Sequence, residues 1–66
     1  RVDCTLELKE YVYIFEFKLD GSADEALQQI EQKGYAKPYA TDHRQVIRIG
    51  MNFSSETRTI AEWKAL

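Results

Sequence analysis

Three side chains near the N-terminus, Asp3, Glu16 and Lys18, have types and spacing that could do chemistry together. Glu16 and Lys18 are two residues apart in a strand-like run, and residues i and i+2 of a strand share one face. A hairpin that pairs residues whose numbers sum to 19 places Asp3 opposite Glu16, with Cβ atoms about 4.5–5.5 Å apart. Because two facing carboxylates repel each other, we expect a cation between or beside them.

The element that positions these groups is the run from Tyr11 to Leu19, Y-V-Y-I-F-E-F-K-L. Its aromatic and β-branched residues are typical of a strand. One face carries what we call the aromatic row, Tyr11, Tyr13, Phe15 and Phe17. The other face begins with Val12 and Ile14 and then turns to Glu16 and Lys18. Burying charges without partners is costly, so this change from apolar to charged residues is the most informative feature of the chain.

The preceding stretch, Val2 to Lys9, alternates apolar and polar residues and predicts a half-buried strand. A tight turn at Lys9–Glu10 would pair it antiparallel with the long strand. The same register places its apolar side, which includes Cys4, against the aromatic row, and a one-residue slip would put acidic side chains there. We therefore expect the aromatic row to be core rather than a base-stacking platform, and Cys4 to be an inert buried thiol.

A helix and a second long strand follow. Ser22 and Glu25 form a capping box, apolar residues recur at helical spacing, and Gly34 suits the helix C-terminus. The run Gln45–Phe53 predicts a strand parallel to Tyr11–Leu19, since a strand, a helix and a strand form a crossover unit. The final stretch, Thr59–Leu66, fits either an edge strand or a short helical turn, and we interpret it as a strand. The fold class is therefore α/β.

Length and charge limit the possibilities. Sixty-six residues make a single domain, residues 1–66, and so short a chain is marginally stable. The formal net charge of −2 argues against a general nucleic-acid coat but not against an enzyme that meets phosphate at one local site. The lone cysteine excludes an internal disulfide, and no signal peptide or membrane-spanning run is present. A single reduced cysteine is typical of a cytoplasmic protein, and we expect that location. We also expect a piece of a longer protein, because the sequence opens directly on a strand without a methionine.

The pattern D-x(12)-E-F-K, with the aspartate and the E-x-K on successive strands of a hairpin, resembles the PD-(D/E)XK nuclease superfamily. The stretch from A-L-Q-Q-I-E-Q-K-G-Y to I-G-M-N-F-S-S-E-T-R is similar to one bacterial group within it. In that group the nuclease-like domain is the C-terminal part of proteins that begin with an AAA-type ATPase-like domain. The resemblance covers nearly all 66 residues. It implies a restriction-endonuclease-like core fragment whose leading helix, which bears a further glutamate, is missing.

The resemblance implies a metal site. Asp3 and Glu16 match the family's two metal-binding carboxylates, although Val2 replaces the proline that usually precedes the aspartate. The backbone carbonyl of Phe17 is a further candidate ligand. The expected ion is Mg²⁺ or Mn²⁺, because hard divalent cations prefer oxygen ligands.

The resemblance also implies two residues that assist the metal site. Lys18 matches the lysine that orients or activates the attacking water, and Gln29, with Tyr35, resembles a helix motif that assists this site. The alternative for Gln29 is a solvated ladder with Glu25 and Lys33 on the outside of the helix.

The hypothesis that follows is that the full-length protein is a Mg²⁺-dependent deoxyribonuclease that hydrolyses DNA phosphodiester bonds, with a site that need not be complete in this fragment. The alternative is a catalytically inactive nuclease-like module that acts in protein–protein interaction, with ordinary ion pairs among the charged groups. The expected partners are DNA, an ATPase-like domain in the same full-length chain, and a second copy of the chain. A homodimer is expected because loss of the leading helix should leave one sheet face or edge exposed.

Other polar residues are interpreted as surface. His43 lies in a polar loop without visible ligand partners, and Arg44 and Arg48 could contact a phosphate backbone but should mostly be solvated. No glycine-rich phosphate-binding loop is present, so ATPase activity would belong elsewhere.

Overall fold

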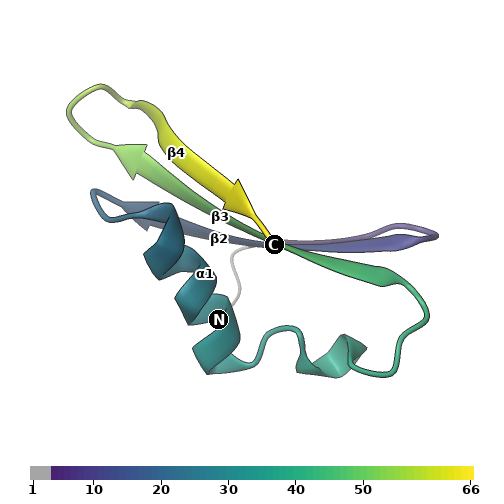
Figure 1. The fold of residues 1–66 in the computed structure, drawn as a ribbon. Coiled ribbons are helices and arrows are strands. Elements are labelled where there is room, and N and C mark those ends of the chain that lie inside the picture. The colour runs from purple at the N-terminus through teal and green to yellow at the C-terminus, as the bar shows by residue number, and fades with distance from the viewer. Residues whose placement is uncertain (1–3) are drawn as a thin grey trace.

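A computed structural model describes residues 4–66 of the chain. The predictions that concern Val2 and Asp3, including the pairing of Asp3 with Glu16, fall outside these residues. The elements in chain order are β1 (Cys4–Glu7), β2 (Tyr11–Leu19), α1 (Ala23–Lys33), a short 3₁₀ helix η1 (Lys37–Tyr39), β3 (Gln45–Ser54) and β4 (Thr59–Ala65) (Figure 1).

The four strands form one mixed sheet in the order β1-β2-β3-β4. β1 and β2 are antiparallel in the predicted register, with Cys4 opposite Phe15 and Leu6 opposite Tyr13. β2 and β3 are parallel through the crossover helix α1, and β4 is antiparallel to β3. The predicted α/β class, restriction-endonuclease-like core and crossover are therefore confirmed. The last stretch is a strand, because its backbone pairs with β3, for example Trp63 with Met51.

The sequence signals at both ends of α1 are confirmed. Ser22 is the N-cap, and its Oγ accepts a hydrogen bond from the Glu25 backbone N–H at 3.0 Å. Gly34 ends the helix in the left-handed conformation, with φ of 68°, which glycine adopts without steric cost. These caps satisfy backbone groups that would otherwise lack partners, so the helix length is set locally.

Gly50 allows α1 to lie directly against the sheet. A Cβ atom at this position would be 2.5 Å from the backbone oxygen of Ala23 and 3.0 Å from the Ala26 Cβ. Only a residue without a side chain fits between the strand and the helix at this distance. The contact therefore fixes where the N-terminal half of α1 crosses β3.

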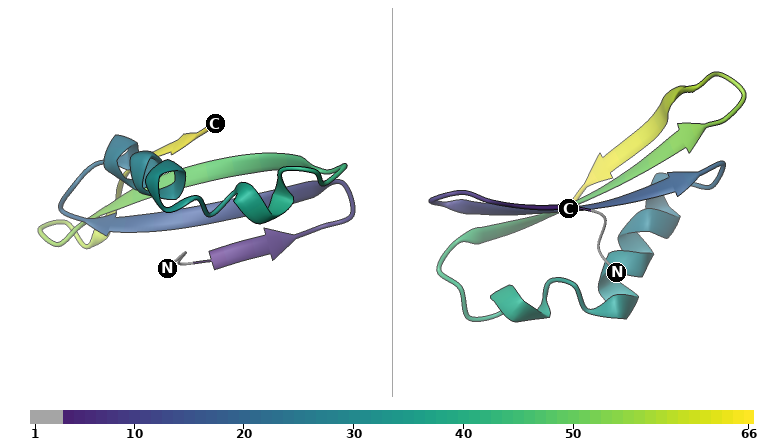
Figure 2. Two further views of the ribbon diagram at one scale, coloured as in Figure 1. Left: turned by 90° about the horizontal axis from the view of Figure 1, so that it is seen from below. Right: turned by 180° about the vertical axis from the view of Figure 1, so that it is seen from behind.

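The hydrophobic core lies between α1 and one face of the sheet. Its fully or almost fully buried apolar members are Val12, Ile14, Ala23, Ala26, Leu27 and Ile30. Figure 2 shows α1 and η1 on the same side of the sheet, with no described element on the other side. We call the side under the helix the covered face and the other side the open face.

Two predictions about burial are wrong. The aromatic row is not core: Tyr11 and Phe17 are exposed, and the two rings between them are half-buried. Cys4 is also exposed. The physical reason is that one crossover helix covers only one face of a sheet, and here it covers the face of Val12 and Ile14. The expectation that one sheet face is left exposed is confirmed.

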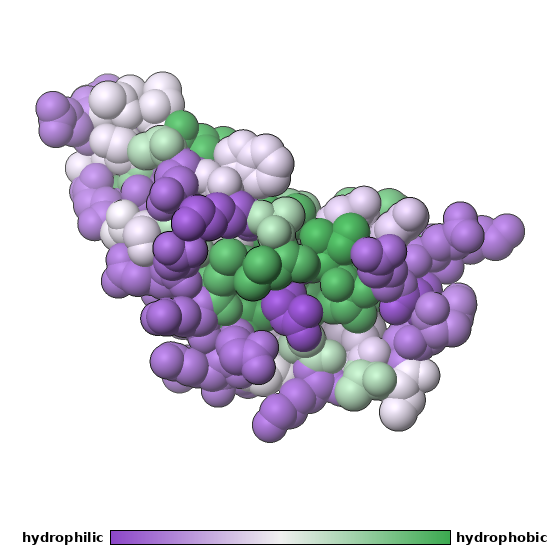
Figure 3. Space-filling model, in the orientation of Figure 1, coloured by the Kyte–Doolittle hydropathy of each residue, from purple (hydrophilic) through white to green (hydrophobic). Residues whose placement is uncertain are grey.

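The molecular surface reflects this one-sided layering. In the space-filling view, hydrophilic residues cover the outer side of α1, while hydrophobic residues reach the surface in the middle of the molecule (Figure 3). Within residues 4–66, no helix is both long enough and apolar enough to cross a membrane.

Candidate functional site

Glu16 is a buried carboxylate on the covered face. Its residue is only 5% exposed, although carboxylates are rarely buried. It follows Ile14 on β2 and lies opposite Gly50 of β3. Because Gly50 has no side chain, α1 approaches closely here and Glu16 is enclosed between helix and sheet. Burial of a charged group at this point is a feature that packing alone would not favour.

Lys18 is joined to the helix by Gln29. The Lys18 Nζ donates a hydrogen bond to the Gln29 Oε1, which connects the end of β2 with the middle of α1. Both residues are half-buried. A lysine ammonium has three donors, so this bond fixes the direction of the amine and leaves two donors for other groups. The structure thus brings Gln29 to Lys18 rather than leaving it in a solvated ladder.

Two further residues at this end of the sheet were not found by sequence reasoning. Asn52 lies opposite Lys18 in the parallel register, is 8% exposed, and its Oδ1 accepts the Gly21 backbone N–H at 2.7 Å. The Glu62 Oε1 accepts the backbone N–H of Ala23 at 2.9 Å, at the positive end of α1. The parallel register could have indicated Asn52. No local signal indicates Glu62, because it arrives through the pairing of β4 with β3.

The described residues offer two oxygen groups of the kind that bind Mg²⁺. Glu16 offers carboxylate oxygen, the ligand type that Mg²⁺ prefers, and the adjoining backbone carbonyl of Phe17 is of the same chemical kind. Across residues 4–66, no group of three or more His, Cys, Asp or Glu side chains gathers in a way that could hold a metal ion. The second carboxylate of the expected pair, Asp3, is outside that range. Glu16 therefore fits as one ligand of a site that needs another.

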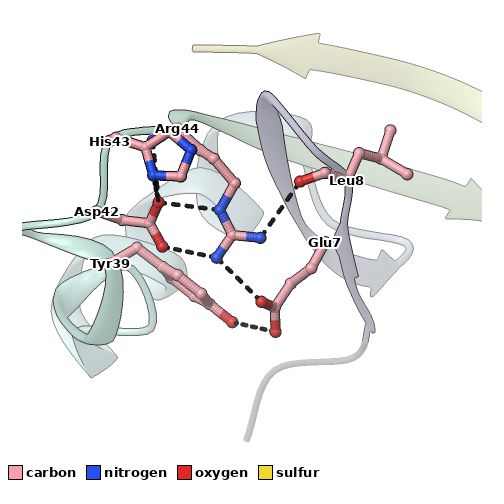
Figure 4. A network of polar contacts seen from close by, with 6 residues as sticks. All are labelled: Glu7, Leu8, Tyr39, Asp42, His43 and Arg44. Atoms are coloured by element: carbon pink, nitrogen blue, oxygen red, sulfur yellow. Dashed lines mark hydrogen bonds and ion pairs between the residues drawn. The ribbon is translucent and has the colours of Figure 1, made fainter.

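A second polar cluster lies at the opposite end of β2, and Figure 4 shows its contacts. The Arg44 guanidinium donates to both carboxylate oxygens of Asp42, at 2.9 and 2.6 Å, and to Glu7 Oε1 at 3.1 Å. It also donates to the Leu8 carbonyl at 3.3 Å, while the Tyr39 hydroxyl donates to Glu7 at 3.3 Å. We call these residues the Arg44 cluster. The prediction of a solvated Arg44 is wrong, since only 17% of its side chain is exposed.

Electrostatics identify the Arg44 cluster as structural. Hydrogen bonds from Arg44 hold the pKa of Asp42 well below its usual range, and those bonds raise the pKa of Arg44 in turn. Removal from water, together with the nearby Glu7 carboxylate, raises the pKa of Tyr39. The adjacent His43 side chain is 84% exposed, as expected of a loop residue. With its donors directed at protein acceptors, Arg44 ties β1 to the loop before β3.

A surface hollow of about 390 Å³ adjoins the Arg44 cluster and does not include the Glu16–Lys18 region. It lies between the end of α1, η1 and β3, and Arg48 lines it. The Arg48 Nε is 4.0 Å from Glu31 Oε2, which is too long for a hydrogen bond. Arg48 is half-buried rather than fully solvated.

Comparison with known proteins shows which family this sequence resembles. A sequence model of the PD-(D/E)XK nuclease superfamily matches residues 1–63. An uncharacterised protein encoded in the region 5′ of vnfD in Azotobacter chroococcum mcd 1 is 37% identical over 62 residues, which is 91% of this chain. The match spans 12% of that relative's length.

No solved structure matches this chain. The family match nevertheless covers almost the whole sequence and includes the E-F-K run on β2, where the structure places a buried carboxylate and a helix-bound lysine. The chain belongs to the PD-(D/E)XK nuclease superfamily.

Proposed function

We propose that this chain is the catalytic core of a Mg²⁺-dependent deoxyribonuclease, with its site at the C-terminal half of β2. The observation that carries the proposal is the pairing of a buried carboxylate, Glu16, with a lysine two residues later whose amine is held by Gln29. Family membership makes nuclease chemistry the natural use of such a pair. A Mn²⁺ ion could replace Mg²⁺ at oxygen ligands.

The proposed metal ligands are Glu16, the backbone carbonyl of Phe17, and Asp3. The register that pairs Cys4 with Phe15 supports Asp3 as the partner of Glu16, because it follows the same sum of 19. When bound, the metal would supply Lewis-acid stabilisation of the phosphoryl charge and a water of lowered pKa. The burial of Glu16 supports this role, since a bound cation would offset the cost of placing a carboxylate between helix and sheet.

In this proposal Lys18 acts on the water and on the phosphoryl oxygens. Residues two apart on a strand are about 7 Å apart, which leaves space for one water between the carboxylate and the ammonium. The Gln29 Oε1 accepts a hydrogen bond from one ammonium N–H and leaves two, so Lys18 can hold that water and donate to charge that develops on the phosphate. Gln29 is thus a positioning residue. Asn52 and Glu62 hold the helix start beside the site.

The partners in this proposal are DNA and, in a longer polypeptide, an AAA-type ATPase-like domain. The chain matches only 12% of its relative, so most of that relative lies outside the nuclease-like region. Any ATPase function would belong to such a region.

The test is metal-dependent cleavage of plasmid and linear DNA by the protein and its variants. Glu16→Gln and Lys18→Ala should each lower the cleavage rate by about 10²–10⁴-fold, the range of one positioned catalytic group. Lys33→Ala is the matched control, because Lys33 is an exposed lysine in the last turn of α1, and this change should leave the rate unchanged.

Gln29 allows a sharper comparison because Gln28 precedes it on α1 and is exposed. Gln29→Ala should lower the rate, since it frees the Lys18 amine, whereas Gln28→Ala should leave the rate unchanged. Calorimetric titration with Mn²⁺ adds a readout without turnover: Glu16→Gln should weaken binding. Cleavage that ignores Glu16→Gln and Lys18→Ala would remove these residues from the reaction. Absence of both cleavage and Mn²⁺ binding would favour an inactive interaction module.

A further inference from the structure

The open face of the sheet is uncharged in the part of the chain that the structure describes. Strand alternation and ladder pairing place on it residues of all four strands, and its described members are Cys4, Leu6, Leu8, Tyr11, Tyr13, Phe15, Phe17, Leu19, Gln45, Ile47, Ile49, Met51, Phe53, Ile60, Trp63 and Ala65. Among these described members there is no Asp, Glu, Lys, Arg or His. Several large apolar side chains are well exposed, including Leu19 at 69% and Trp63 at 62%. An apolar patch of this extent marks an interaction surface.

We propose that the open face is a self-association surface on which two copies of this chain pack sheet to sheet. Two such sheets would lie about 10 Å apart, with strand directions within about 30° of each other. A two-fold arrangement needs a patch that complements itself. This face meets that requirement, because an uncharged apolar surface opposes a copy of itself without leaving any charge unpaired.

The area agrees with a specific dimer. Strands of four to ten residues, about 3.3 Å long per residue and about 4.8 Å apart, give the open face roughly 500 Å² per copy. Two copies would then bury about 1,000 Å² or more in total, which reaches the threshold of specific interfaces. Charged residues resume at the ends of the strands, at Lys9–Glu10 and at Asp20, and would form a polar rim.

The centre of the face has the composition of an interface core. The aromatic row is stacked along β2 with ring centroids 6.1–6.4 Å apart, and Phe53 of β3 lies 5.9 Å from Phe17. Aromatic side chains are enriched in interface cores and binding hot spots. A nucleic-acid platform would also use aromatic rings, but it would need cations to meet the phosphates, and none of the described members of this face is cationic.

Dimerisation would also help the fold. The core under α1 is small, because it has six buried apolar residues and two of them, Ala23 and Ala26, are alanines. A domain of this size usually needs a further source of stability. Burial of the open face against a second copy would supply one through the hydrophobic effect.

The test uses the protein itself in sedimentation velocity over a wide range of concentrations. The single tryptophan, Trp63, reports directly on the open face. We expect the mass to rise from one chain to two with concentration, and the Trp63 emission to move to shorter wavelength in parallel. Single-stranded DNA should not change that emission.

Two variants and a matched control locate the interface. Trp63→Lys and Leu6→Lys place a charge at opposite edges of the open face, on exposed positions of β4 and β1, and each should weaken dimerisation by at least about tenfold. Leu66→Lys places the same charge on an equally exposed apolar residue that lies on the other side of the sheet, beside α1, and should leave the dimer unchanged. Leu6→Lys retains Trp63, so its emission should stay at the monomer wavelength.

A protein that stays a folded monomer by circular dichroism at every concentration would overturn the proposal. So would a dimer that tolerates both Trp63→Lys and Leu6→Lys, because its interface would be elsewhere. Quenching of Trp63 by single-stranded DNA would also overturn it, by showing a nucleic acid as the occupant. None of these outcomes depends on DNA cleavage, so the dimer and the proposed nuclease activity are tested separately.

Discussion

The two faces of the sheet reverse the usual distribution of charge. The covered face contains the core, yet it also has polar and charged side chains beneath or beside α1, namely Glu16, Lys18 and Asn52. The open face is uncharged in its described members, yet it is exposed. In the C-terminal half of β2, successive residues therefore alternate between the open apolar face and the charged part of the covered face.

The two faces of β2 each contain side chains in an energetically unfavourable place. A charge under a helix costs free energy unless it has a partner, and the proposed metal site would supply one for Glu16. Apolar surface without cover also costs free energy, so its presence indicates a partner. In the Arg44 cluster, the charged groups form hydrogen bonds with one another.

The largest expected effect comes from comparing Ile14 with its neighbour Phe15. Ile14→Ala removes a fully buried side chain and should cost about 2–5 kcal/mol of unfolding free energy. Phe15→Ala should cost clearly less in dilute protein, because its ring lies on the open face. Urea denaturation measures both. If Ile14→Ala does not fold, Ile14→Val, with an expected loss of about 0.5–1.5 kcal/mol, replaces it. Equal losses in dilute protein would contradict the assignment of the core to one face.

A somewhat smaller effect is expected where α1 meets β3. Gly50→Ala places a Cβ against the Ala23 backbone oxygen and should cost about 1–3 kcal/mol through overpacking. Gly21→Ala is the matched control, because its Cβ would lie 2.8 Å from the far end of the flexible Glu25 side chain and in ordinary contact with the Lys18 Cβ at 3.5 Å, with no backbone atom as near. Thermal unfolding followed by circular dichroism measures both variants. A neutral Gly50→Ala would mean that the helix can move away from the covered face without penalty.

Loss of the helix cap should have a moderate effect. Ser22→Ala removes the acceptor for the Glu25 N–H and should lower the unfolding free energy by about 1 kcal/mol. Ser22→Asp keeps an acceptor at the cap and should retain most of the stability. The measurement is urea denaturation of the three proteins side by side. An equal loss in Ser22→Asp would show that the hydroxyl acts through another contact.

The smallest expected effect is the acid response of the Arg44 cluster, which joins β1 to the loop before β3. The pKa of Asp42 is lowered in the folded protein, so its contribution to stability is complete above the ordinary value of 3.8 and is lost as pH falls below it. Arg44→Met should therefore be less stable than the parent near neutral pH, and the difference should shrink in acid. Urea midpoints against pH measure this, with Gln32→Ala, at an exposed uncharged position of α1, as control. A difference that does not vary with pH would assign the effect of Arg44 to packing.

Local signals in the sequence predicted most of the elements correctly. The alternation in β1, the aromatic and β-branched run in β2, and the caps at Ser22 and Gly34 each depend on neighbouring residues, so they can be recognised without the fold. The hairpin register was also predictable, because a one-residue slip would have put acids against aromatics. The site residues of β2 were predicted as a group, and the structure places Gln29 on Lys18, while Asp3 remains a prediction.

Which face the helix covers could not be predicted from those signals. Both faces of β2 begin with apolar residues, so periodicity predicted the more apolar face as the core, and the burial of Cys4 and the aromatic row was predicted wrongly with it. The choice depends on contacts between distant residues: Gly50 lets α1 approach the covered face, and the Ala23 N–H is held by Glu62 across the sheet.

The sequence by itself determined the strands, the helix caps, the hairpin register and the family. These follow from residue spacing and from side chains that interact with near neighbours. Only the tertiary structure decided that the helix lies over the charged face, that Asn52 and Glu62 join that end of the sheet, and that Arg44 is internally paired. Those facts arise where segments far apart in the chain meet, and one strand with two apolar faces is compatible with either side being buried.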